Sequence, residues 1–94
     1  MKKEWPIEVG RIVRSKAGRD AGRYFVITAL DGKEFVFVAD GRKRRIEAPK
    51  RKRVKHLYVT EETISSLQCK LNAGEKVENF EIREELRAFT QKEE

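Results

Sequence analysis

Apolar residues in the first two thirds of the chain occur in short runs that favour β-strands. Residues 9–14, 23–30 and 34–39 are rich in β-branched and aromatic side chains, which pack well on a pleated surface. The run at 23–30 is almost continuously apolar, as expected for a central strand buried on both faces. Asp31-Gly32 and Asp40-Gly41 follow the second and third runs, and Asp-Gly pairs are common in hairpin turns. This regular spacing predicts a small all-β sandwich or barrel.

The first strand and the later strands are less regular. Val9 and Val13 share one face of the first predicted strand, whereas Ile12 takes the other. We therefore expect either a β-bulge or burial on both faces. The two remaining strands are predicted at Ile46, ended by Pro49, and at residues 54–60.

Two short amphipathic helices are predicted after the strands. Thr60 acts as the N-cap of the first, and Glu61 and Glu62 lie in its first turn, where the helix dipole favours negative charge. Gly74 ends this helix, and Asn79 caps the second. Each helix has one apolar stripe, formed by Ile64, Leu67 and Leu71 in the first and by Ile82, Leu86 and Phe89 in the second.

Charge divides the chain into two parts. Residues 1–60 contain 17 basic and 7 acidic residues, a net charge of +10, whereas residues 61–94 carry a net charge of −4. Nine of the fourteen residues from 42 to 55, which we call the basic tract, are lysine or arginine. A chain of 94 residues is long enough for one domain with a modest core. We expect a β-barrel over residues 1–60 and an acidic helical extension over residues 61–94.

The loop at residues 16–23 places glycine and basic side chains between the first two predicted strands. Gly18 and Gly22 stand where the chain must turn, and glycine reaches positive φ without a steric penalty. The segment around GRDAGR resembles the KOW motif, a strand–loop–strand signature of many ribosomal and transcription-associated proteins. The residues that carry the resemblance are Gly10, Ile12, Val13, Ser15, Gly18, Arg19, Asp20, Gly22, Arg23 and Val26.

Phe25 stands where many KOW motifs have a further glycine. In this respect the chain is similar to KOW proteins of archaeal and eukaryotic large ribosomal subunits and to small bacterial KOW-domain RNA-binding proteins. The resemblance implies a mainly β fold, a small five-stranded SH3-like barrel followed here by the two helices. It also implies that the ligand is RNA.

The concentration of positive charge points to the same class of ligand. A charge run is often only a solvated surface, but clustered cations repel one another unless an anion compensates them. Guanidinium groups suit bidentate contacts with phosphate. We expect non-catalytic binding of structured or ribosomal RNA through its backbone. The candidate RNA-binding residues are Arg11, Arg14, Lys16, Arg19, Arg23, Arg42, Lys43, Arg44, Arg45, Lys50, Arg51, Lys52, Arg53 and Lys55.

Aromatic residues allow two interpretations. Tyr24, Phe35, Phe37 and Tyr58 can form a platform on which bases stack, or they can fill the core of a small domain. We expect core positions, and hence recognition of the backbone and shape of RNA rather than of its bases.

Other functions remain as alternatives. A protein-interaction module of the transcription or translation machinery would use the apolar stripe of Ile82, Leu86 and Phe89 to dock a ribosomal or polymerase protein. A structural ribosomal component would have a basic tract that orders only on assembly. The acidic helices either face away from RNA or cover the basic surface.

The sequence carries no signature of an enzyme, a cofactor site or a metal site. His56 is the only histidine and has no evident nucleophile beside it. Cys69 is the only cysteine, so we expect a reduced thiol in a buried or half-buried position. Neither a signal peptide nor an apolar run of membrane-spanning length is present. We expect a cytoplasmic monomer.

Overall fold

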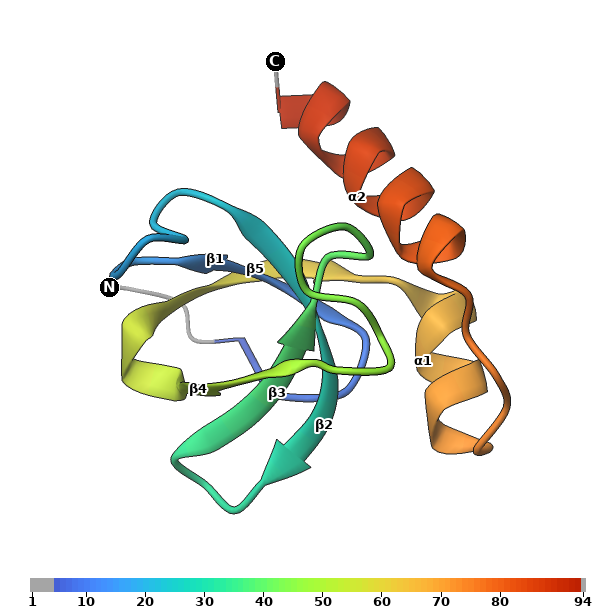
Figure 1. Cartoon of the computed structure of the whole chain (residues 1–94), viewed down its shortest axis with the longest axis horizontal. Helices are drawn as coiled ribbons and strands as arrows, with labels where there is room; N and C mark the ends of the chain where they lie inside the picture. The colour runs from blue at the N-terminus through green and yellow to red at the C-terminus, as the bar shows by residue number, and fades with distance from the viewer. Residues whose placement is uncertain (1–4, 94) are drawn as a thin grey trace.

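One antiparallel β-sheet followed by two helices forms the computed structural model, which describes residues 5–93 (Figure 1). The strands are β1 (Arg11–Ser15), β2 (Tyr24–Asp31), β3 (Phe35–Ala39), β4 (Lys50–Arg53) and β5 (Leu57–Thr63). A 3₁₀ turn, Val54–His56, joins β4 to β5. The helices are α1 (Ser65–Asn72) and α2 (Asn79–Glu93). The expectation of a mainly β fold with C-terminal helices is confirmed.

The five strands lie in the order β4-β3-β2-β1-β5, which leaves β4 and β5 as the edges of an open sheet. The hairpin predicted at Asp31-Gly32 is confirmed, because Asp31 pairs with Phe35 across the turn. The irregularity expected in the first strand is also present. The register between β1 and β5 shifts between Arg11 and Val13.

The first half of the central strand β2 is buried on both faces, as its apolar sequence predicted, whereas the second half is only half-buried and Leu30 is exposed. Phe25 and Ile27 belong to one core cluster, and Val26 between them belongs to another. The first cluster, the inner core, consists of Val13, Phe25, Ile27, Val36, Val38 and Leu57. The second, the helix-facing core, consists of Ile12, Val26, Ala39, Ile64, Leu67, Val77, Ile82, Leu86 and Phe89. The two helices therefore share a core with the sheet and cover one of its faces.

The apolar stripe of α2 packs against the sheet. Ile82, Leu86 and Phe89 are buried, and the ring of Phe89 meets that of Tyr24 edge to face with centroids 5.2 Å apart. The stripe is therefore occupied within the protein and does not offer the docking surface that a protein-interaction module would use. Within residues 5–93, neither helix has the length and apolar character needed to cross a membrane.

The fourth strand begins at Lys50 and not at Ile46, so that prediction was wrong. β4 has the sequence KRKR and pairs along its length with β3. Because side chains alternate along a strand, Lys50 and Lys52 lie on one face, and Arg51 and Arg53 on the other. Ile46 packs instead against the helix-facing core. A strand built only of basic residues has no apolar alternation by which its sequence would reveal it.

The predicted N-cap of the first helix is also wrong. Residues 60–62 belong to β5, which begins at Leu57 rather than at residue 54, and α1 begins only at Ser65. The hydroxyl of Thr60 donates a hydrogen bond of 2.6 Å to the carbonyl of Ile12, where the register of β1 and β5 shifts. The hydroxyl that suited a helix cap therefore stabilises the irregular part of the sheet.

Asn79 begins α2 but does not cap it as predicted. Its Oδ1 accepts a hydrogen bond of 2.8 Å from the amide of Ile46, and its Nδ2 donates to the carboxylate of Glu47. At the helix start, Glu81 accepts a hydrogen bond of 2.8 Å from the amide of Glu78, as in a capping box. The side chain of Asn79 thus ties α2 to the 40–49 loop.

Gly74 ends α1 as predicted, whereas the position of Cys69 differs from our expectation. Gly74 has a φ of +72°, and the amide of Glu75 donates to the carbonyl of Lys70, which is the hydrogen bond of a Schellman motif. Cys69 is exposed. Leu67 points into the core, and a residue two positions further along a helix lies on the opposite side.

Gly41 allows α2 to approach the start of the 40–49 loop. Its φ is +77°, and a Cβ at this position would collide with the carbonyl oxygen of Asn79. We predict that Gly41→Ala lowers the free energy of unfolding by about 2–4 kcal/mol, from backbone strain and steric overlap together. The measurement is equilibrium denaturation with urea.

Gly18→Ala is the matched control for this prediction. Gly18 has a similar φ of +79°, but apart from Gly18 itself and its two chain neighbours no described atom lies within 4 Å of a Cβ placed there. The control should lose only about 1–2 kcal/mol. Equal losses in the two variants would contradict the close packing of α2 against Gly41.

Candidate nucleic-acid interface

Main-chain hydrogen bonds fix the 16–23 loop over the ends of β1 and β2. Gly18 and Gly22 have φ angles of +79° and +88°, as their place in the motif predicted. The amide of Gly22 donates to the carbonyl of Ser15, and the amide of Ser15 donates to the carbonyl of Arg23, both at 2.9 Å. The cationic side chains of the loop therefore start from a defined backbone.

Asp20 ties this loop to β4. Its Oδ2 lies 3.1 Å from Nζ of Lys50 and 3.7 Å from Nζ of Lys52. Lys52, which is only 9% exposed, also donates a hydrogen bond of 2.8 Å to the hydroxyl of Ser15. Two segments far apart in the sequence, the 16–23 loop and the basic tract, therefore meet at one carboxylate.

Burial and charge have opposite effects on the pKa of Asp20. Burial alone raises the pKa of the carboxyl group, but the hydrogen bond from Lys50 and the charges of Lys50, Lys52 and Arg44 outweigh it. The pKa of Asp20 consequently lies below its ordinary value. Burial lowers the pKa of Lys52, and the attraction of Asp20 offsets only part of this effect. The cluster remains cationic, because one carboxylate faces three basic groups.

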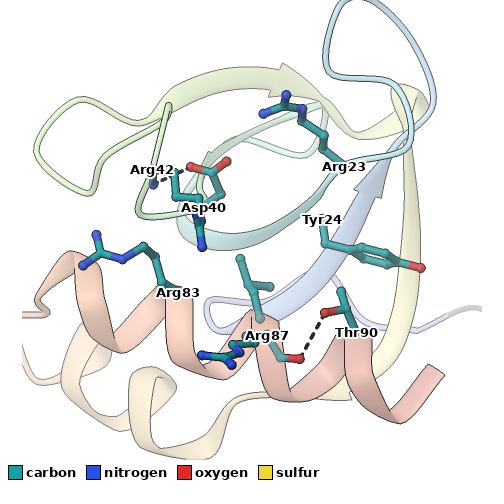
Figure 2. A pocket seen from close by; sticks show the side chains of 8 residues that line it. Arg23, Tyr24, Asp40, Arg42, Arg83, Arg87 and Thr90 are labelled. Atoms are coloured by element: carbon teal, nitrogen blue, oxygen red, sulfur yellow. Dashed lines mark hydrogen bonds between the residues drawn. The ribbon is translucent and has the colours of Figure 1, made fainter. Parts of the chain in front are cut away.

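A cleft of about 300 Å³ lies between the loop and α2 (Figure 2). Arg23 at the end of the loop and Arg42 of the basic tract line it, together with Arg83 and Arg87 of α2. The remaining lining residues are Tyr24, Asp40, Leu86 and Thr90. Four arginines from three parts of the chain thus line one cleft.

The backbone and side chains around the cleft are held by hydrogen bonds. Nη1 of Arg83 donates to the carbonyl of Gly41 at 2.8 Å. Oδ1 of Asp40 accepts hydrogen bonds from the amides of Arg42 and Arg44, at 2.8 and 3.0 Å. The carboxylate of Asp40 therefore stabilises the turn that carries Arg42.

Arg83 and Arg87 were not among the residues predicted from the sequence. The net negative charge of residues 61–94 led us to assign the whole helical segment as acidic. The signal that could have found these two arginines is their spacing, because residues four apart on a helix share a face. The sequence could not show that this face lies opposite the 16–23 loop.

Arg11 lies outside the interface. It is 5% exposed, and its guanidinium donates to the carbonyl of Pro6 at 3.0 Å and to the carboxylate of Glu8 at 2.9 Å. Its charge is used inside the protein, where it holds the segment before β1 against the sheet. We therefore do not retain Arg11 as an RNA-binding residue.

Arg51 and Arg53 form a separate basic surface on the opposite face of β4 from Lys50 and Lys52. Both guanidinium groups lie over the ring of Phe35, at 3.7 Å and 5.0 Å from its centroid. Arg51 also forms an ion pair of 2.7 Å with Asp31. The basic tract thus divides between two faces rather than forming one.

Most of the remaining predicted residues lie at the surface. The guanidinium of Arg14 lies 6.0 Å from the ring centroid of Tyr24, which lines the cleft. Arg45 forms an exposed ion pair of 3.4 Å with Glu47. Arg19, Lys43 and Lys55 are exposed, and Arg44 is partly buried near Asp20.

The expected core positions of three aromatic residues are wrong. Valines of β3 fill the inner core, so the alternating Phe35 and Phe37 lie on the other face and are half-buried. Tyr58 is 57% exposed, and the ammonium group of Lys16 lies 4.5 Å from its ring centroid. The fourth aromatic residue, Tyr24, does pack against the helix-facing core.

Comparison of the chain with models of known protein families found no match. Among residues 5–93, no group of three or more His, Cys, Asp and Glu side chains is arranged to hold a metal ion. The functional assignment therefore depends on the geometry of the interface and on the residues of the 16–23 loop.

Asp20→Asn tests the ionic link between the loop and β4. We predict that it lowers the free energy of unfolding at pH 7 by about 1–3 kcal/mol, because the charged hydrogen bonds are lost. Folding lowers the pKa of Asp20, so its contribution is present above the ordinary value of 3.8 and is lost as the pH falls below it. The variant should therefore lose less stability than the parent in this acidic range. Urea denaturation across a pH series measures the free energy of unfolding of the parent and of the variant. If the two free energies fall in parallel as the pH falls, the proposed role of Asp20 is contradicted.

Proposed function

We propose that this protein binds structured RNA, including ribosomal RNA, without catalysing a reaction, and that it makes phosphate contacts from the 16–23 loop and the basic tract. The observation that carries the proposal is the convergence of these two segments. Asp20 joins them by ion pairs to Lys50 and Lys52, and Arg23 and Arg42 line the same cleft. Clustered charge of one sign is unfavourable in the free protein and becomes favourable when a polyanion approaches.

The loop conformation supports the KOW resemblance and, with it, the choice of RNA. Two glycines with positive φ lie between antiparallel strands, at the positions where the motif has glycine. The SH3-like barrel that the resemblance implies is part of the same proposal. The inner core, enclosed by side chains from β1, β2, β3 and β5, supports a strongly curved sheet of this kind.

Recognition of backbone and shape fits this interface better than readout of individual bases. Its groups are guanidinium and ammonium ions, which contact phosphate without regard to sequence. We place the protein in the cytoplasm, in association with ribosomes or with the translation machinery, and acting as a monomer.

Salt dependence is the first test of this function. For a labelled hairpin RNA, we predict an affinity that falls steeply as salt rises, because each phosphate that is neutralised releases a counterion. The double variant R19Q/K43Q should reduce the slope of log affinity against log salt by about 1–2. Fluorescence anisotropy over a salt series measures affinity and slope together.

R19Q/K43Q removes two exposed cations that form no ion pair within residues 5–93. K76Q/K92Q removes the same charge from exposed lysines that pair with Glu78 and Glu62, and it should leave the affinity nearly unchanged. An affinity that stays constant with salt, or equal effects of the two double variants, would contradict the proposal.

A further inference from the structure

We propose that the cleft between the 16–23 loop and α2 is a binding site for one phosphate group, and that Arg83 and Arg87 of α2 complete it. This inference rests on the proposed RNA-binding function and names a site within it. It also gives the C-terminal helix a direct part in binding, although its segment of the chain has a net negative charge.

The charge of the cleft favours an anion. Its lining holds four arginines and one acidic residue, Asp40. Oδ1 of Asp40 already accepts hydrogen bonds from two backbone amides of the turn, those of Arg42 and Arg44. The guanidinium groups in the cleft therefore exceed the negative charge available to them, and an arriving phosphate would relieve their mutual repulsion.

Two acidic residues of α2, Glu81 and Glu85, are engaged away from the cleft. Glu81 binds the ammonium group of Lys70 on α1 and the amide of Glu78. Glu85 lines a different hollow, on the side of α2 where Lys92 and Ser65 lie. Arg83 and Arg87 line the cleft, whereas its lining includes no described glutamate of α2, so the net charge of the segment does not describe the face at the cleft.

The cleft is held in place before any ligand binds. Arg83 is anchored by its hydrogen bond to the carbonyl of Gly41, and Leu86 and Phe89 fix the orientation of α2 by packing into the helix-facing core. Figure 2 shows that the side chains of Arg23, Arg42, Arg83 and Arg87, which all line the cleft, come from the 16–23 loop, the basic tract and α2. An arranged site loses less conformational entropy on binding than flexible surface cations do.

The chemistry of the lining identifies the ligand as a phosphate group. Guanidinium groups bind phosphate oxygens through paired N–H donors. The volume of about 300 Å³ is at the lower end for ligand clefts, which suits a phosphate with its adjoining sugar. Such a phosphate is either an internal phosphodiester of the RNA backbone or a phosphate at a 5′ end.

The test uses R87Q and the double variant R83Q/R87Q with a labelled hairpin RNA, prepared with and without a 5′-phosphate. R87Q leaves the Arg83–Gly41 hydrogen bond in place, so it separates binding from any loss of stability. We predict that the double variant weakens binding about tenfold and lowers the salt slope by about 1. R87Q alone should produce part of this loss. K76Q/K92Q is the control with the same change in net charge.

The two RNA preparations distinguish the source of the phosphate. Equal losses with both hairpins would identify an internal phosphodiester, whereas a loss confined to the 5′-phosphorylated hairpin would identify a terminal phosphate. If R83Q/R87Q and R87Q bind like K76Q/K92Q while R19Q/K43Q is weakened, the cleft proposal is wrong and the RNA-binding function stands. If the unaltered protein shows no salt-dependent binding to either hairpin, the proposed function itself is wrong.

Discussion

The ion pairs of Asp20 with Lys50 and Lys52 are the contact on which the arrangement of the basic surface depends. β4 is an edge strand made of four charged residues, and it can contribute little apolar surface to the inner core. Lys52 is nonetheless nearly buried, and a buried ammonium group is tolerated only with charged or hydrogen-bonding partners. Asp20 and Ser15 supply those partners. The burial of Lys52 and the position of the 16–23 loop are thus two consequences of one contact.

The alternation of β4 explains why one charge run has two roles. Lys50 and Lys52 bind the loop, whereas Arg51 and Arg53 cover Phe35 on the other face. The run therefore contributes to the fold as well as to the surface charge. Only part of the charge of β4 therefore remains available to a ligand. Other exposed cations of the basic tract, such as Arg42 and Lys43, lie in the loop before β4.

The sequence predicted the elements whose stability comes from local patterns. β2 and β3 follow from their β-branched residues, the end of α1 from Gly74, and the buried stripe of α2 from its helical spacing. The predictions from sequence were wrong where a tertiary contact overrides a local preference for one type of secondary structure. The hydroxyl of Thr60 donates a hydrogen bond to the carbonyl of Ile12 across the sheet and does not cap a helix. The fourth strand was predicted at Ile46, but it begins at Lys50 because the basic residues that follow pair with β3.

The same distinction applies to the interface, and it explains why the cleft could not be found from charge counts along the chain. Net charges of +10 and −4 for the two parts of the sequence predict a cationic barrel with an acidic extension. The fold instead distributes charge by the face of each element. α2 buries Leu86 in the helix-facing core, so Arg83 and Arg87, three positions before and one position after it, lie at the edge of that contact, beside the 16–23 loop. Because packing of the apolar stripe sets the rotation of the helix about its axis, the hydrophobic core decides which charges of α2 face the loop.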